Sequence, residues 1–300
     1  MKKYAIVVDS SCGLTQEQAA KLGWFYLPLY LEIDGVNYAD GIEITPDTLF
    51  DKFNLKATVK TSSFNLEQAN ELFEKLSKEY EHIIMYPISK HLSSAYQTLK
   101  LMENDFPKLR VISSVEVVQL IAFDCIWMQN ELDKDFSKLD EVITFLENNG
   151  FRKSITLIPK YNQYLVKGGR LHPAAALIAK IFKLVPLIKW VDGQLLKEGI
   201  GHKFDKSIMK NMTKKHEEFK IEKGFSELVV MEHSGIPQEE KMKYVKEIEK
   251  IYNTNVLLCF IPPVVSIHVG PESYALMLIE MKEETKQLIL EKFKEINYKA

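Results

Sequence analysis

Tyr86-Pro87-Ile88-Ser89-Lys90-His91-Leu92-Ser93-Ser94-Ala95-Tyr96-Gln97 is the stretch that decides the fold of this chain. The apolar run over residues 83–88 predicts a buried strand, and Ser93 or Ser94 stands where a helix through Leu99 would begin. The N-terminal end of a helix favours an anion, and small hydroxyl side chains add hydrogen-bond donors. Ser93 is therefore either a plain helix N-cap or part of an anion site.

Other predicted strands also end in hydroxyl-bearing residues. These endings are Asp9-Ser10-Ser11-Cys12-Gly13, Thr61-Ser62-Ser63 and Ser113-Ser114. Helix-length segments separate the strands, which predicts an α/β domain with a mostly parallel sheet flanked by helices. In such domains ligands gather outside the carboxyl ends of the strands, so the hydroxyl clusters mark a candidate site.

Helix caps and tight turns punctuate the rest of the chain. Thr15 with Gln18 predicts a capping box, and Asn65 predicts the start of the helix through Lys78. The Asp-Gly pairs at 34–35 and 192–193 predict hairpins. Gly168 is the candidate left-handed terminator of a short helix.

Asn148-Asn149-Gly150 predicts a hinge between two domains. We expect an N-terminal α/β domain at residues 1–153, which carries the hydroxyl-rich head-group site. Residues 154–300 are expected to form a smaller α/β domain with a mixed sheet, in which the C-terminal residues form a charged helix.

Composition excludes several classes of protein. Of 300 residues, 39 are Lys or Arg and 41 are Asp or Glu, so the net charge of -2 offers no broad basic field for nucleic acid. Cys12, Cys125 and Cys259 are widely spaced, which argues against a disulfide framework or a zinc site and fits a reducing cytoplasm. The apolar tract 171–190 is interrupted by Lys and Pro, so we expect no integral membrane segment.

Strong enzyme motifs are absent from the sequence: no Walker loop, GxGxxG, HExxH or GxSxG occurs. His268, before a Gly-Pro turn, is either a structural histidine or a cleft residue. Cys12, near a helix start, is a candidate nucleophile of lowered pKa with His268 as its base. Arg170 after two glycines marks either a helix end or a phosphate contact, and the basic stripe at residues 202–214 is either a solvated face or a dock for an acidic partner.

Taken together, six short strings resemble the DegV family of bacterial fatty-acid-binding proteins, in order and over nearly the whole chain. They are Asp9-Ser10-Ser11, Tyr38-Ala39-Asp40-Gly41, Lys60-Thr61-Ser62, Leu92-Ser93-Ser94-Ala95-Tyr96-Gln97, Lys167-Gly168-Gly169-Arg170-Leu171 and His268-Val269-Gly270-Pro271. The resemblance implies a non-enzymatic carrier that binds one long-chain fatty acid as its ligand and presents the carboxylate to a fatty acid kinase. It implies no cofactor and no metal.

The resemblance also implies which residues form the site. Thr61, Ser62, Ser93 and His268 are expected to bind the fatty-acid carboxylate, with Arg170 and Ser94 in support. The ligand is expected between the domains, with its acyl chain in the C-terminal domain, where the apolar stretch 174–188 is either a tunnel wall or simple core.

Two departures from the family pattern keep other functions open. Ser94 and Ala95 replace a Gly-Thr pair, and residues 197–203 lack the arginine that the family usually carries after the second hairpin. The alternatives are an acyl-ester hydrolase that uses Cys12 or Ser93 with His268, and a lipid-binding sensor without a kinase partner.

Overall fold

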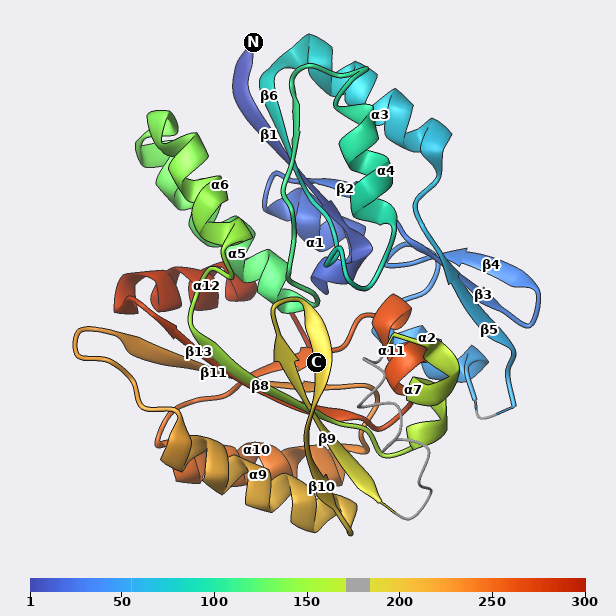
Figure 1. Ribbon diagram of the computed structural model, residues 1–300, viewed down its shortest axis with the longest axis vertical. Coiled ribbons are helices and arrows are strands. Elements are labelled where there is room, and N and C mark those ends of the chain that lie inside the picture. The colour runs from blue at the N-terminus through green and yellow to red at the C-terminus, as the bar shows by residue number, and fades with distance from the viewer. Residues whose placement is uncertain (55, 171–183) are drawn as a thin grey trace. The chain divides into compact units, whose positions relative to one another are not determined.

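The computed structural model describes residues 1–54, 56–170 and 184–300 (Figure 1). The chain forms two compact units. Unit 1 comprises Met1–Gly150, Pro262–Val264 and Glu291–Tyr298, and unit 2 comprises Phe151–Ile261, Val265–Leu290 and Lys299–Ala300. The two later segments of unit 1 lie within the range 154–300, which the sequence assigns to the second domain.

Unit 1 is built on a parallel sheet with the strand order β2-β1-β6-β7. Its elements are β1 (Lys2–Asp9), η1 (Ser10–Cys12), α1 (Gln16–Lys21), β2 (Phe25–Leu27), α3 (Leu66–Glu79), β6 (Tyr80–Tyr86), α4 (Ala95–Met102), β7 (Leu109–Val111), α5 (Gln119–Lys134), η2 (Phe136–Lys138) and α6 (Leu139–Glu147). Residues 5–8 and 83–86 are buried, as expected for strands covered on both faces. Figure 1 shows α3 and α4 on one side of the sheet and α5 and α6 on the other.

A small antiparallel sheet completes unit 1, with the order β4-β3-β5, and α2 (Pro46–Lys52) follows β4. Its strands are β3 (Tyr30–Ile33), β4 (Val36–Ala39) and β5 (Val59–Ser62). Asp34 and Gly35 both have positive φ, so the predicted hairpin is confirmed. The Thr15–Gln18 capping box and the Asn65 cap are also confirmed.

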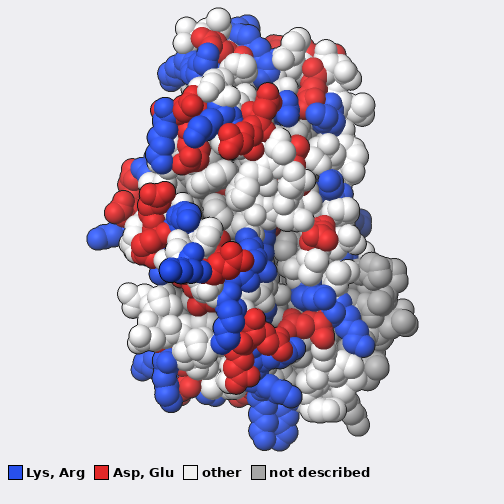
Figure 2. All heavy atoms as spheres, turned by 60° about the vertical axis from the view of Figure 1, so that its left-hand side comes forward, with Lys and Arg blue, Asp and Glu red and all other residues white. Residues whose placement is uncertain are grey.

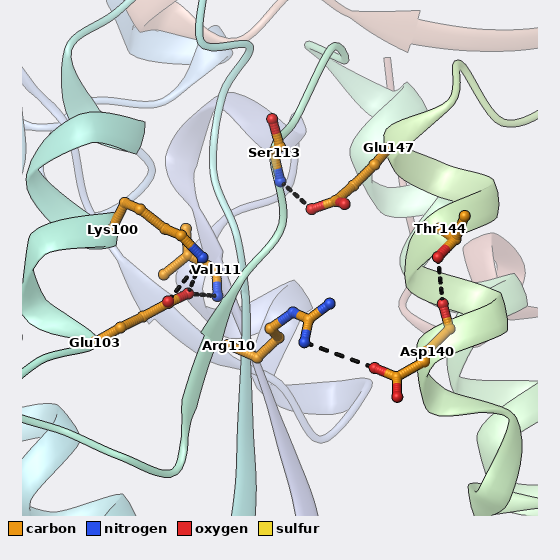
Figure 3. Close-up of polar contacts among 8 residues, drawn as sticks. All are labelled: Lys100, Glu103, Arg110, Val111, Ser113, Asp140, Thr144 and Glu147. Carbon is orange, nitrogen blue, oxygen red and sulfur yellow. Dashed lines mark hydrogen bonds and ion pairs between the residues drawn. The ribbon is translucent and has the colours of Figure 1, made fainter.

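Two glutamates from neighbouring helices accept hydrogen bonds from the outer edge of strand β7 and the residues that follow it (Figure 3). The Val111 N–H donates to Glu103 Oε1 at 2.8 Å, and the Ser113 N–H donates to Glu147 Oε1 at 2.7 Å. Between them, the Ile112 N–H pairs inward with β6. The carboxylates therefore occupy the outward N–H groups that another strand would otherwise use.

We expect Glu103→Ala to lower the free energy of unfolding by about 1–2 kcal/mol, because the buried Val111 N–H loses its acceptor. Glu103→Gln keeps an oxygen at that place and should cost less than half as much. Urea denaturation measures both values. Equal losses would instead assign the effect to the ion pair between Lys100 and Glu103.

Unit 2 is built on a mixed six-stranded sheet with the order β10-β9-β8-β13-β11-β12. Its elements are β8 (Lys153–Ile158), α7 (Asn162–Gly168), β9 (Val185–Val191), β10 (Gln194–Gly201), α9 (Phe204–Glu218), β11 (Ser226–His233), α10 (Gln238–Tyr252), β12 (Leu257–Phe260) and β13 (Tyr274–Met281), with α11 (Pro263–Val269) and α12 (Glu283–Glu295) each shared with unit 1. Apolar side chains of α9 and α10 pack on one face of this sheet and form its core. The predicted mixed sheet is confirmed.

The surface carries both signs of charge. On the face drawn in Figure 2, basic and acidic side chains intermix over both the upper and the lower part. No helix in the described ranges is long and apolar enough to cross a membrane.

Candidate functional site

The turn between β6 and α4 is tied to neighbouring loops through its backbone. The Ser89 N–H donates to the Glu116 carbonyl at 2.8 Å, and the Lys90 N–H donates to the Ser114 carbonyl at 3.0 Å. Near its start, the Ile88 N–H donates to Asp9 Oδ2 at 2.7 Å. The turn that carries Ser93 is therefore fixed by residues that follow β7 and by Asp9, the last residue of β1.

Ser93 is half-buried, and its Oγ accepts a hydrogen bond from the Ala95 N–H at 3.1 Å. Because the hydroxyl accepts at the start of α4, its own hydrogen can point to a ligand. Ser94 is the exposed N-cap residue, and its side chain makes no capping hydrogen bond. The predicted helix start is confirmed, and Ser93 supplies the capping oxygen.

Thr61 and Ser62 point to opposite faces of β5, because successive side chains in a strand alternate. Thr61 is half-buried, whereas Ser62 is exposed. The next residue, Ser63, has a buried Oγ for which the described residues offer no hydrogen-bond partner. Ser63 belongs to the same hydroxyl cluster in the sequence and is a further candidate for this site, which the sequence analysis did not include.

His268 lies in the last turn of α11 and packs closely on α7. A Cβ placed on Gly168 would lie 2.8 Å from His268 Nδ1, so a glycine is required beside the imidazole. Burial, and then the positive charge of Arg170, lower the pKa of His268 to about 4. The imidazole is therefore neutral at pH 7, with one ring nitrogen as a donor.

Arg170 follows α7 and is exposed. Its Nη1 donates to the Gly168 carbonyl at 2.6 Å, which brings the guanidinium to the same part of unit 2 as His268. The left-handed helix terminator is Gly169, with φ +68°, and Gly168 is the last helical residue. The prediction that Gly168 is the terminator was wrong by one residue.

Two buried serines that the sequence analysis missed hold the turn after His268. Ser234 Oγ donates to the Gly270 carbonyl at 2.5 Å, and Ser273 Oγ donates to the Val269 carbonyl at 2.8 Å. Both side chains are buried, and they satisfy carbonyls at the C-terminal end of α11. No local signal marks Ser234, which is 36 residues from Gly270, whereas Ser273 is only four residues from Val269.

Cys12 does not have the properties expected of a nucleophile. Its side chain is 0% exposed, and burial raises the pKa of the thiol well above its ordinary value. The prediction of a lowered pKa was wrong. Cys12 belongs to unit 1 and His268 to unit 2.

Two fully buried carboxyl groups, Asp9 and Asp40, lie within electrostatic reach of each other in unit 1. Asp9 accepts from the Ser11 N–H at 3.0 Å and the Ser11 hydroxyl at 2.5 Å, in addition to Ile88. Asp40 Oδ2 accepts from the Val264 N–H at 3.3 Å. Both residues lie within short motifs of the sequence, but no local signal there indicates a role for either of them.

Burial raises both pKa values, that of Asp9 to about 6 and that of Asp40 to about 8. Hydrogen bonds from Ser11 and Ile88 hold the pKa of Asp9 lower, whereas the charge of Asp9 adds to the rise at Asp40. At pH 7 the pair therefore carries one negative charge, mostly on Asp9.

The predicted site residues stand in two groups. Thr61, Ser62, Ser93 and Ser94 belong to unit 1, and His268 and Arg170 belong to unit 2. The predicted tunnel wall at 174–188 lies outside the described residues as far as residue 183, and its last residues form part of β9. Among the described residues, no group of three or more His, Cys, Asp or Glu side chains is placed to hold a metal ion.

Comparison with known proteins gives matches over nearly the whole chain. A family model described as "Uncharacterised protein, DegV family" matches residues 3–281. A DegV domain-containing protein of Mycoplasmopsis pulmonis is 34% identical over 298 residues, covering 97% of this chain and 100% of that protein.

Two solved structures share the fold. One, from Thermus thermophilus, is described as fatty acid binding of a DegV family protein; it has a TM-score of 0.77 and 22% identity, and covers 93% of this chain and 100% of that one. The other, from Eubacterium ventriosum, is described as a fat acid (stearic acid)-binding protein; its TM-score is 0.78 at 24% identity, covering 92% and 98%. The predicted α/β fold is confirmed by both.

Proposed function

Because this chain belongs to the DegV family, we propose that it binds a single long-chain fatty acid and buries the acyl chain. Thr61, Ser62, Ser93 and His268 bind the carboxylate in this proposal, and Arg170 and Ser94 support them. The chain is a carrier in a reducing cytoplasm and not itself an enzyme. The two similar structures described as fatty-acid-binding proteins support the ligand class.

The main support for this proposal is that Ser93 and His268 each offer an uncharged hydrogen-bond donor. Ser93 has its hydroxyl oxygen engaged by Ala95, so its hydrogen is directed elsewhere, and His268 is held neutral with a ring N–H. An ionised carboxylate accepts hydrogen bonds from such groups, and a buried one without them costs several kcal/mol. Burial of the acyl chain favours binding by roughly 0.8 kcal/mol for each of about fifteen methylene groups, before the cost of ordering the chain is subtracted.

Affinity for palmitate tests the site residues one by one on delipidated full-length protein. We expect Ser93→Ala and His268→Asn each to weaken binding about tenfold, because each removes one hydrogen bond to a charged group. Thr61→Val keeps the shape of the side chain and should cost a similar factor. Ser137→Ala and His82→Asn, at positions outside the site, are the matched controls. Wild-type affinity in all three site variants would overturn the assignment.

The finer part of the proposal is that the bound carboxylate is presented to a fatty acid kinase. Uncharged donors leave a carboxylate oxygen nucleophilic, as phosphoryl transfer by a separate enzyme requires. Release of acyl phosphate on addition of a DegV-system kinase and ATP tests this step. Palmitate binding without any phosphorylation would support the alternative of a lipid sensor, which the sequence of residues 197–203 keeps open.

A further inference from the structure

We propose that Asp9 and Asp40 are positioning residues for fatty-acid binding: the two buried carboxyl groups anchor, through hydrogen bonds to Ile88 and Val264, the backbone segments that carry Ser93 and His268. This inference rests on the proposed function, and it gives a role to two motif residues that contact neither the proposed carboxylate donors nor the acyl chain in that proposal.

Asp9 anchors the Ser93 segment. It accepts three hydrogen bonds, from the Ser11 N–H, the Ser11 hydroxyl and the Ile88 N–H, and all three partners are donors. The two backbone N–H groups can only donate, so these hydrogen bonds favour the ionised form of Asp9 and hold its pKa below the value that burial alone would give. Ile88 is the residue at which β6 passes into the turn of Ser93, so the charge on Asp9 fixes where this turn begins.

Asp40 anchors the helix of His268. Its Oδ2 accepts from the N–H of Val264 in the first turn of α11, and His268 lies four residues further along the same helix. Val264 and His268 belong to the same seven-residue helix, so loss of the hydrogen bond at Val264 loosens the segment that carries His268. Oδ1 of Asp40 is buried and has no hydrogen-bond partner among the described residues, which leaves room for a proton there.

The surroundings explain why the pair carries one charge. The groups that act on Asp40 are Asp9, the Ser10 hydroxyl and the backbone at Gly41 and Val264, and the buried Cys12 and Tyr26 also face the pair. Within the described part of the chain, none of the main contributions to either pKa shift comes from a cation. A second buried negative charge would therefore be repelled by the first, so above about pH 8 the Asp40 anchor is strained.

Substitutions at Asp40 and Asp9 test the two anchors separately. Asp40→Asn keeps an acceptor for Val264 and places its NH₂ where the protonated oxygen stood, so it mimics the uncharged form. Asp40→Ala removes the acceptor. Asp9→Asn places an NH₂ group, which is itself a donor, against the N–H of either Ser11 or Ile88, so one of these hydrogen bonds is lost. Glu227→Gln is the matched control, since burial raises the pKa of Glu227 to about 7 although it lies on β11 and holds neither segment.

The test measures palmitate affinity of the delipidated full-length protein from pH 6 to 9, compared between variants at each pH so that ionisation of the ligand cancels. At pH 7 we expect Asp40→Asn and Glu227→Gln to bind as wild type does, and Asp40→Ala and Asp9→Asn to bind about tenfold more weakly. Between pH 7 and 9 wild type and Glu227→Gln should lose affinity relative to Asp40→Asn by fivefold or more. An unchanged ratio of wild type to Asp40→Asn, or wild-type affinity in Asp40→Ala, would overturn the inference.

A second readout separates this inference from the proposed function. Amide hydrogen exchange of the unliganded protein should show faster exchange at Val264 in Asp40→Ala and at Ile88 in Asp9→Asn, each relative to wild type. If wild type does not bind palmitate at pH 7, the proposed function fails and the exchange data alone decide whether the anchors exist. Unchanged exchange at both amides would refute them.

Discussion

Gly270→Ala is expected to lower the free energy of unfolding of unit 2 by about 3 kcal/mol. Gly270 has φ +87°, which costs a residue with a Cβ about 1 kcal/mol. That Cβ would also lie 2.4 Å from Tyr164 Cδ2 and 2.9 Å from Cγ, within a buried contact. Overpacking of this kind typically costs a further 1–3 kcal/mol.

A matched glycine separates the two causes. Gly224 has φ +88°, and a Cβ there would meet nothing within 4 Å, so Gly224→Ala measures the backbone cost alone. Unfolding in urea can be followed by Trp190 of unit 2 after Trp24 and Trp127 are replaced by Phe. If both alanine variants lose the same free energy, the contact with Tyr164 is not tight.

Asp40→Asn is expected to stabilise the protein at alkaline pH by on the order of 3 kcal/mol relative to wild type. Burial raises the pKa of Asp40 to about 8, above the unfolded value of 3.8. The folded state therefore binds more protons than the unfolded state between these values, and the stability of wild type falls as the pH rises from about 4 to about 8. Asparagine has no proton to lose, so this part of the fall disappears.

Urea denaturation at pH 5, 7 and 9 measures this effect. The difference between Asp40→Asn and wild type should grow with pH up to about 8 and then stay constant. Asp9→Asn is the contrasting variant: it faces three donors, and we expect it to destabilise the protein at pH 7. Parallel stability curves for wild type and Asp40→Asn would show that Asp40 does not titrate in this range.

Local features of the fold could be predicted because their causes lie within a few residues. The Thr15 capping box and the Asp34–Gly35 turn depend only on neighbours in the sequence, and both are present. The site is different. Asp9 meets a residue 79 positions away, and Asp40 meets one 224 positions away, so no periodicity or spacing could pair them.

The pKa and exposure of a single side chain could be predicted from the sequence only where its burial could also be predicted. Cys12 stands near a helix start, which predicts a thiol of lowered pKa, yet the fold buries it near Asp9 and Asp40 and raises its pKa. Ser62 stands beside Thr61 in the sequence, but strand alternation exposes it on the other face. In both cases the tertiary environment determined the outcome.

Fatty-acid binding can be tested on purified protein that has never been delipidated. The protein is extracted with organic solvent, and the released molecules are identified by mass spectrometry. A mock purification without the protein provides the blank. We expect close to one long-chain fatty acid per chain, and less from His268→Asn and Ser93→Ala. A protein that releases no fatty acid above the blank, and takes up none when palmitate is added, would contradict the account.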